Sequence, residues 1–350
     1  MNPTLIDVSI KEGAFLVQHR ILLEHVSAIT AGLAISGIEY AEISHGHGVG
    51  SFKRGKGGLH TDEELLESAQ KAAPQLKLGS FFSGASAWRE DVDSVAEFIH
   101  FGRVGCNCDD LEHTKTLVQR LKEFKKHALV QFMRVHRFPI EQVCQAAQTV
   151  QDMGADVLYI TDTYGSMSDQ DVAHYISALT KTVDIPIGFQ GRNATGRAMH
   201  NTLVAFENGA TWLDGALLGA GRGAGTTQLE VLVSHLQSQK LLSEVSLKEL
   251  CFTAKHHVLP ALQNPPHVRL AHCLMAKYKI DFGIDHFLES LSPMLELDQE
   301  TVLQRMQEHR PNMIQVTDDD LRYIFAESNI DFDIAMEYLS TGEVPKYSDA

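Results

Sequence analysis

Strand-like and helix-like segments alternate eight times in the first 240 residues, and this repeat constrains the fold more than any other feature. Short apolar runs, typical of buried parallel strands, are each followed by a segment with helical spacing. The expected strands are Leu5–Ile10, Ile38–Ile43, Leu76–Phe82, Gly102–Asn107, Ala128–Met133, Asp156–Thr161, Ile185–Phe189 and Thr211–Leu217. Eight such units indicate an α/β fold, a closed (β/α)8 TIM barrel, and a doubly wound open sheet is the alternative.

Local signals place several helix ends. A helix over Leu22–Leu33 is expected to stop by Gly37, because glycine commonly ends helices. Thr61 and Ser168 precede helical segments and are expected to cap them. A glycine-rich loop over Gly219–Gly225 follows the last strand and precedes a helix that starts at Gln228.

The remaining sequence predicts a second domain. We assign residues 1–240 to the barrel and residues 241–350 to a helical C-terminal domain, which carries a Pro265-Pro266 break and a polar end. This domain is expected to pack on the barrel, or to form an oligomer contact, such as that of a homodimer, or a partner contact.

The charge balance limits the partners. Lys and Arg number 30 against 45 Asp and Glu, which gives a formal net charge of −15. Such acidity argues against nucleic acid or an anionic membrane as a general partner. No charged-then-apolar leader opens the chain, and no apolar run is long enough to span a bilayer, so we expect a cytoplasmic protein.

Polar side chains gather just after the expected strands, where a β/α barrel keeps its chemistry. This set includes Lys11, Glu12, His45, His47, His136, Asp162, Thr163, Tyr164, Gln190, Arg192 and Asn193. A purely structural barrel has no need of so many ionisable groups at one end, so we predict an active or binding site there.

Each feature also has a simpler interpretation. His45 and His47 could bind a metal with His136, but histidines in a glycine loop are more often hydrogen-bonded or solvent-facing. Lys11 could form a Schiff base or merely an ion pair. Asp162 could act on substrate or hydrogen-bond the backbone. The Gly219–Gly225 loop could cradle a phosphate or carboxylate, or serve only close packing.

Six stretches, taken in order, carry a resemblance to a known family. They are Asp7–Gly13, Glu42–Gly48, His60–Asp62, Tyr159–Met167, Gly188–Asn193 and Asp214–Gly225. The sequence resembles the pyruvate-dependent 4-hydroxy-2-oxovalerate aldolases of the DRE-TIM metallolyase (HMG-CoA lyase-like) superfamily. The C-terminal part is similar in kind to the aldolases' second domain, which implies an acylating aldehyde dehydrogenase-like partner.

The resemblance implies a divalent metal, Mn²⁺ or Mg²⁺, that this sequence is not suited to bind. In the family the ligands are an aspartate of an Arg-Asp-Gly motif after strand one and two histidines of a His-X-His motif after strand seven. The matching positions here hold Glu12, Gln190 and Arg192, with Lys11 at the arginine position and Phe15 where the aldolases have a histidine base. A guanidinium has no lone pair to donate. We therefore expect no metal and no other cofactor. Arg192 and Lys11 could instead bind a carboxylate or enolate by charge, and Glu12 and Arg192 could also form an ion pair that closes the metal pocket.

The resulting prediction is a lyase or aldolase-type enzyme that makes or breaks a C–C bond in a small keto acid or related carboxylate. Its catalytic candidates are Lys11, Glu12, His45, His47 and His136. Its substrate-binding candidates are Arg192, Gln190, Asn193, Asp162, Thr163 and Tyr164. The sequence leaves two alternatives open: a non-catalytic ligand-binding or scaffold subunit, and a different reaction in the altered pocket.

Overall fold

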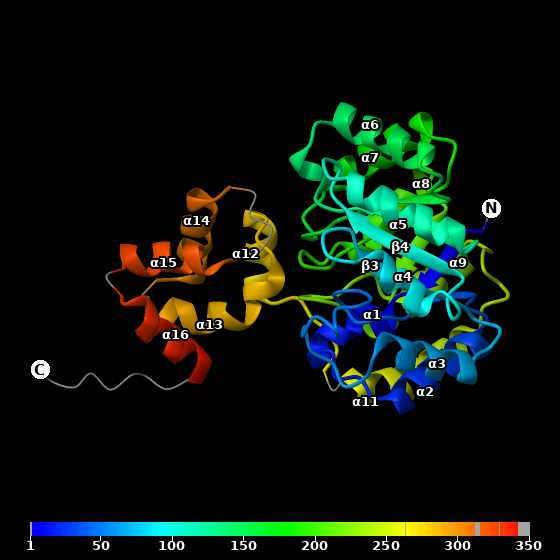
Figure 1. Cartoon of the computed structure of the whole chain (residues 1–350), viewed down its shortest axis with the longest axis horizontal. Coiled ribbons are helices and arrows are strands. Elements are labelled where there is room, and N and C mark those ends of the chain that lie inside the picture. Colours follow the sequence, from blue (N-terminus) through cyan, green and yellow to red (C-terminus); the bar gives the residue numbers. More distant parts are fainter. Residues whose placement is uncertain (1, 263, 296, 312–315, 329, 342–350) are drawn as a thin grey trace, which may run out of the picture. The chain divides into compact units, whose positions relative to one another are not determined.

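Eight parallel strands close into a barrel in the computed structural model, which confirms the TIM-barrel prediction (Figure 1). The structure describes residues 2–262, 264–295, 297–311, 316–328 and 330–341. Each strand pairs with the next, and β8 closes the sheet against β1 through the Leu5–Leu213 register. The strands are β1 Thr4–Asp7, β2 Tyr40–Glu42, β3 Lys77–Ser83, β4 Phe101–Cys106, β5 His127–Phe132, β6 Val157–Thr161, β7 Ile187–Gln190 and β8 Trp212–Gly215.

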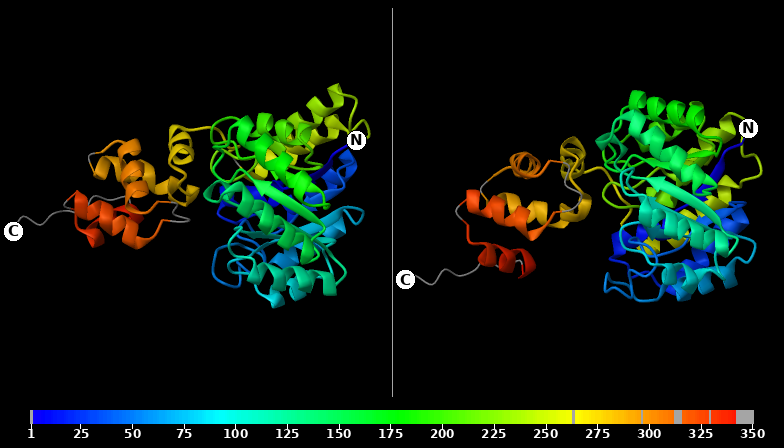
Figure 2. Two further views of the ribbon diagram at one scale, coloured as in Figure 1. Left: turned by 90° about the horizontal axis from the view of Figure 1, so that it is seen from above. Right: turned by 45° about the horizontal axis from the view of Figure 1, so that its top comes forward.

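Helices cover the outside of the barrel (Figure 2). Because both faces of the sheet are covered, the strands are almost continuously buried, as their apolar composition requires. The helical elements of this part are α1 Ser9–Gly13, η1 Ala14–Val17, α2 Leu23–Ser36, α3 Asp62–Ala72, α4 Arg89–Val95, α5 Glu112–Glu123, η2 Val135–Arg137, α6 Ile140–Asp152, α7 Asp169–Thr182, α8 Ala198–Glu207, η3 Leu217–Gly219, α9 Leu229–Ser238, α10 Leu247–Thr253, η4 Ala254–Val258 and α11 Leu259–Leu262.

The predicted helix ends are confirmed. Gly37 ends α2 with φ of 88°, a left-handed conformation that favours glycine. Thr61 caps α3 through a reciprocal pair of hydrogen bonds with Glu64, and Ser168 caps α7 in the same way with Asp171.

The first strand is shorter than predicted, which changes the setting of Lys11 and Glu12. β1 ends at Asp7, and Ser9–Gly13 forms the short helix α1. The Asp7 carboxylate accepts hydrogen bonds from the Ser9 backbone N–H (3.0 Å) and hydroxyl (2.6 Å), a local turn that competes with extended backbone. Lys11 and Glu12 therefore lie on a helical turn above the strand.

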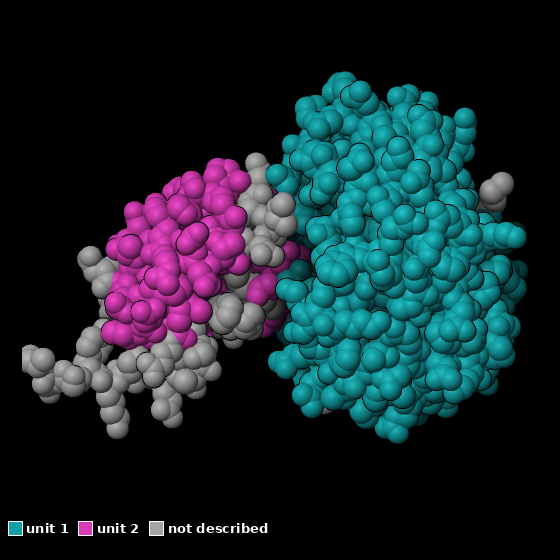
Figure 3. Space-filling view, in the orientation of Figure 1, with its two compact units in different colours: residues 1–267 teal, residues 268–350 magenta. Residues whose placement is uncertain are grey.

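The chain forms two compact units, Met1–His267 and Val268–Ala350 (Figure 3). The first unit extends past residue 240, where the sequence analysis ended the barrel domain. The reason is that the segment after α9 returns to the barrel: the Ser246 N–H donates to the Ser36 carbonyl at the end of α2 (2.7 Å). α10 then packs against α2.

The second unit is helical, as predicted for the C-terminal part. Its elements are α12 Leu270–Tyr278, η5 Phe282–Ile284, α13 Asp285–Met294, α14 Gln299–His309, α15 Asp318–Glu327 and α16 Phe332–Thr341. Met275, Leu303 and Ile324 are fully buried and belong to its apolar interior. Across both units, no helix in the described ranges is long and apolar enough to cross a membrane.

Candidate functional site

Three charged side chains meet at the carboxyl ends of β1 and β7, and we call Lys11, Glu12 and Arg192 the mouth cluster. Lys11 Nζ lies 2.6 Å from Glu12 Oε1. Arg192 grips the same carboxylate with two N–H groups, at 2.7 Å to Oε2 and 3.1 Å to Oε1. The ion pair expected between Glu12 and Arg192 is thus present, although 180 positions separate the two residues.

The mouth cluster carries one surplus positive charge. Burial alone would raise the pKa of Glu12, but the charges of Arg192 and Lys11 outweigh it and lower the pKa from 4.5 to about 2. Glu12 is therefore ionised at neutral pH and faces two cations. Its side chain is fully buried, whereas that of Arg192 is 13% exposed, so the arginine is the member that reaches outward.

Lys11 is enclosed by an aromatic ring as well as by Glu12. Its Nζ lies 4.3 Å from the centre of the Phe81 ring, within the range of a cation–π contact, and its side chain is only 6% exposed. The loop after β2 rests on the same phenylalanine, because the Val49 N–H donates to the Phe81 carbonyl (2.9 Å).

The amide oxygen and the amide nitrogen of Gln190, the last residue of β7, have different surroundings. Its Oε1 accepts a hydrogen bond from Gln131 Nε2 (2.9 Å), and Gln131 also contacts Thr161. With its oxygen engaged, Gln190 is left with the Nε2 group, which is buried and has no hydrogen-bond partner among the described residues. Because an unsatisfied buried donor costs free energy, this N–H is suited to meet an oxygen of a ligand.

The predicted histidines have different surroundings. His45 is buried, its Nε2 lies 2.8 Å from the His60 carbonyl, and its backbone N–H donates to Asp62 (3.1 Å). This histidine thus secures the loop after β2. His136 lies on η2 with its ring 5.4 Å from that of Tyr164.

His47 is exposed and belongs to a ring cluster that sequence reasoning did not foresee. Its ring centre lies 5.1 Å from that of Phe15 and 4.8 Å from that of His19. His19 Nδ1 accepts a hydrogen bond from the Gly46 N–H (3.2 Å). Burial lowers the pKa of His19 to about 4, and the neighbouring His47, His45 and Arg222 charges act in the same direction. His19 is therefore neutral at pH 7.

The other predicted binding residues make contacts that organise the loops. Asp162 accepts backbone N–H bonds from Ser166 (3.0 Å) and Met167 (3.3 Å), and burial raises its pKa to about 6. Thr163 Oγ1 accepts from the Arg134 backbone (2.9 Å). Asn193 Oδ1 accepts from the Ala198 N–H at the start of α8 (3.3 Å).

Close packing accounts for the glycine-rich loop after β8. A Cβ added at Gly225 would lie 2.1 Å from the Gly219 carbonyl oxygen. One added at Gly221 would lie 2.8 Å from the Thr226 side chain. The loop folds on itself through the Thr226 N–H, which donates to Gly219 (3.0 Å). Glycine is needed here because backbone approaches backbone.

A second buried charge group lies inside the barrel, and we call Arg103, Glu42 and Asp214 the interior cluster. Arg103 is fully buried, contacts Asp214 with two N–H groups and lies 2.6 Å from Glu42. Its guanidinium also stacks on the Tyr159 ring, 4.3 Å from the ring centre. Burial raises the pKa of Glu42, and the opposing charges of Arg103 and Lys11 do not offset it.

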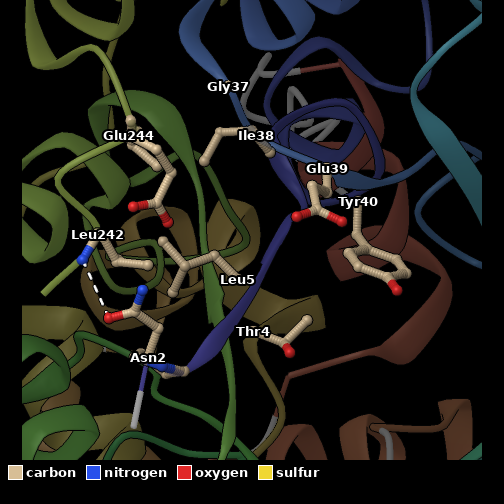
Figure 4. Close-up of a pocket in the computed structure, with 11 residues that line it drawn as sticks. Asn2, Thr4, Leu5, Gly37, Ile38, Glu39, Tyr40, Leu242 and Glu244 are labelled. Atoms are coloured by element: carbon tan, nitrogen blue, oxygen red, sulfur yellow. Dashed lines mark hydrogen bonds between the residues drawn. The ribbon is translucent and has the colours of Figure 1, made fainter.

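A cavity of about 270 Å³ opens at the other end of the barrel, by the amino-terminal ends of β1 and β2 (Figure 4). Asn2, Glu39, Tyr40 and Glu244 are among its lining residues, and the Leu242 N–H donates to Asn2 (3.2 Å). Barrel enzymes keep their chemistry at the carboxyl end of the strands. The mouth, rather than this cavity, is therefore the candidate site.

The HMGL-like family profile matches residues 2–256, which include all eight strands and the mouth cluster. The chain belongs to the HMGL-like family. Curated relatives include the oxaloacetate decarboxylase of Mycobacterium tuberculosis, 32% identical over 74% of this chain and 77% of that protein. The 4-hydroxy-2-oxovalerate aldolase of Carboxydothermus hydrogenoformans is also 32% identical, over 75% of this chain and 78% of that protein.

Solved structures share the fold of this HMGL-like chain. The carboxyl transferase domain of Rhizobium etli pyruvate carboxylase with pyruvate aligns with a TM-score of 0.75 at 15% identity, over 95% of this chain and 61% of that one. The N-terminal domain of a putative aldolase from Bacteroides vulgatus aligns with a TM-score of 0.69 at 15% identity, over 83% of this chain and 96% of that one.

Sequence reasoning about this HMGL-like chain missed three residues that the structure brings to the barrel's polar groups: His19, Arg103 and Gln131. Arg103 and Gln131 stood inside predicted strands, and a charged or amide residue within an apolar run was the available signal. His19 stands seven positions after Glu12. Its contact with Gly46 in the loop after β2 joins residues 27 positions apart, so neighbouring residues give no sign of it.

Proposed function

We propose that this protein is a carbon–carbon lyase or aldolase that acts on a small keto acid and uses its own cations in place of a divalent metal. The observation that carries the proposal is the mouth cluster: one ionised carboxylate faces two cations, and an unpartnered amide N–H lies at the end of β7. A surplus positive charge in a water-poor site favours a bound anion.

The donor set supports the absence of the family's metal. Both Glu12 oxygens accept hydrogen bonds from cations, and the Gln190 oxygen is engaged by Gln131. Arg192 offers no lone pair and would repel a divalent ion. In the described part of the chain, no three His, Cys, Asp or Glu side chains, His45, His47 and His136 included, are grouped so that they could hold a metal.

In the proposed reaction, the outward side of Arg192 binds the substrate carboxylate. Lys11 and the Gln190 N–H stabilise negative charge on the keto oxygen. When the C–C bond between the α and β carbons of the keto group breaks, its electron pair forms the C=C bond of an enolate as the carbonyl π pair moves onto oxygen, and these donors hold the oxyanion. A base removes the proton of the hydroxyl group on the β carbon, so that this half leaves as an aldehyde. The base then returns a proton to the enolate carbon.

We assign the proton transfer to His47 and the positioning of the two cations to Glu12. His47 is exposed and packs on Phe15, whose position corresponds to the aldolases' histidine base. His45 is buried and holds its loop. A carboxylate with a pKa near 2 is a weak proton acceptor at neutral pH, which suits Glu12 to an electrostatic role.

The names of the curated relatives support the substrate class, because both activities concern a keto acid. A Schiff base at Lys11 is the less favoured chemistry, since its Nζ is held by the Glu12 carboxylate 2.6 Å away. A non-catalytic ligand-binding subunit remains the competing function, because Glu12 and the two cations already satisfy much of one another's charge. The homodimer and the dehydrogenase-like partner stay predictions.

The test is an assay of aldol cleavage and of oxaloacetate decarboxylation on metal-analysed protein, with and without added Mn²⁺ or a chelator. We expect turnover by metal-free protein that added Mn²⁺ does not raise. Stoichiometric metal with metal-dependent turnover would contradict the metal-free mechanism. Saturable pyruvate binding without turnover would instead support the ligand-binding subunit. Borohydride treatment with pyruvate should leave no mass adduct on Lys11.

A further inference from the structure

A cavity of about 490 Å³ lies beside the mouth, where the segment after α1 meets the loop after β2. Its lining residues are Phe15, Gln18, His19, Arg20, His47, Lys56, Gly57 and Gly58. Lys11, Glu12, Gln190 and Arg192 are not among them, whereas His47, the proposed proton-transfer residue, is, so this cavity adjoins the proposed keto-acid site. Phe15 connects the two, because it follows Glu12 by three positions.

The cavity is cationic on a strongly acidic protein. Arg20 and Lys56 are exposed at its edge, and a third cation, Arg222, lies over the Phe15 ring at 5.3 Å from the ring centre. None of the eight lining residues, all in the described part of the chain, carries a carboxylate. Against a net charge of −15, such a concentration of positive charge favours an anion.

Neutral donors complement the cations. Because His19 Nδ1 accepts the Gly46 N–H, the neutral ring carries its proton on Nε2. The His19 Cδ2 atom, which is bonded to Nε2, faces Gly57: a Cβ built on Gly57 would lie 3.9 Å from it. At Gly58, which has a φ of +126°, an added Cβ would lie 2.6 Å from His45 Cε1. The cavity wall is thus bare backbone here.

The wall also stores backbone strain. Gln18 and His19 are consecutive non-glycine residues in the left-handed region, with φ of 50° and 63°. Such a conformation costs free energy, and strained residues of this kind concentrate at ligand sites. The strain places Gln18, His19 and Arg20 along one wall of the cavity.

We propose that this cavity binds a phosphate group carried by the second half of the substrate, so that the lyase acts on a phosphorylated aldehyde or its aldol with a keto acid. The proposal rests on the proposed function for its substrate role. A phosphate dianion offers three oxygens to the Arg20 fork, the Lys56 ammonium and the His19 N–H. The volume exceeds the need of a keto-acid carboxylate and suits the phosphorylated part of a larger substrate.

Binding is tested first, on the full chain by titration calorimetry with inorganic phosphate. The double variant Arg20→Gln/Lys56→Gln should weaken phosphate binding at least about tenfold. Lys53→Gln is the matched control, because Lys53 stands in the same loop, pairs with Glu63 (2.7 Å) and does not line the cavity. Absence of saturable phosphate binding, or equal weakening by the control, would overturn the site.

Turnover measurements then distinguish a site for the phosphate group of a substrate from a site for free phosphate. In pyruvate-dependent aldol addition, glyceraldehyde 3-phosphate should exceed glyceraldehyde in kcat/KM by about tenfold or more, and the double variant should lose this preference. Turnover of both aldehydes without preference would overturn the substrate assignment while the proposed function stands. If neither aldehyde reacts but the double variant alone loses phosphate binding, the proposed function fails and the phosphate site is supported.

Discussion

The mouth cluster and the interior cluster contain the same types of side chain, but the pKa of the glutamate is shifted in opposite directions in the two. Each pairs a buried glutamate with an arginine, yet the pKa of Glu12 is lowered to about 2 and the pKa of Glu42 is raised. Glu12 pairs directly with two cations, Lys11 and Arg192. Glu42 shares one arginine with Asp214. Burial destabilises the ionised Glu42 carboxylate more than the charge of Arg103 stabilises it.

Exposure separates the clusters further. Arg103 is fully enclosed, whereas the Arg192 side chain is 13% exposed. The interior cluster therefore has no surplus positive charge and no access, which suits a role in holding β2, β4 and β8 together. The mouth cluster has both, which suits it to bind an anion. Net charge and access, rather than the presence of an ion pair, distinguish the candidate site from the scaffold.

The largest expected effect is the loss of stability on Arg103→Met. It leaves Glu42 and Asp214 buried without a cation, which should lower the free energy of unfolding by about 3–5 kcal/mol. Urea unfolding measures this change. Arg192→Met should cost clearly less stability, because Lys11 still neutralises Glu12. Equal losses of unfolding free energy in Arg103→Met and Arg192→Met would contradict the assignment of the interior cluster to the scaffold and of the mouth cluster to the site.

Arg192→Met should instead abolish most of the proposed activity. Loss of the charged partner of the substrate carboxylate should lower kcat/KM for keto-acid cleavage by about 10²–10³-fold. Arg197→Met provides the control, because Arg197 is half-buried outside the mouth cluster and pairs with Asp169 (3.2 Å) at the start of α7. Wild-type turnover in Arg192→Met would remove Arg192 from the site.

The two glutamates should give opposite pH dependences of stability. The lowered pKa of Glu12 contributes stability above pH 4.5 that is lost as the pH falls toward about 2, on the order of 3 kcal/mol. The raised pKa of Glu42 makes the folded state bind its proton more tightly, so its contribution falls as the pH rises above its ordinary pKa of 4.5. The free energy of unfolding should be measured against pH for the wild type, Glu12→Gln and Glu42→Gln. The difference between the wild type and each variant should change with pH in opposite directions for the two variants. Changes in the same direction would contradict the comparison.

The smallest expected effect is that of Gln190. Gln190→Leu removes the N–H donor and should lower kcat/KM for the keto acid about tenfold. Gln190→Glu should lower it further, since a carboxylate there would repel the enolate. Steady-state kinetics of both variants decide the point, and an equal or higher rate for Gln190→Glu would show that position 190 offers an acceptor, as a metal site requires.

Much of the fold was predictable because strand and helix periodicity are local. The eight units and the caps at Thr61 and Ser168 follow from neighbouring residues. The end of β1 was wrong, because the Asp7–Ser9 turn competes with extension over an apolar pattern that fits either. The mouth residues were identified from their places after strands, but Arg103 and His19 were not, since contacts distant in sequence give them their surroundings.

The sequence by itself determined the barrel, and its resemblance to a known family predicts that Glu12, Gln190 and Arg192 stand where that family has metal-binding residues. Only the tertiary structure decided what those residues do. Barrel closure brings positions 12 and 192 within hydrogen-bond distance, and it pairs the Gln190 oxygen with Gln131 so that its N–H has no partner among the described residues. Residue type sets which bonds are available, whereas burial and the full set of neighbours set net charge, pKa and access.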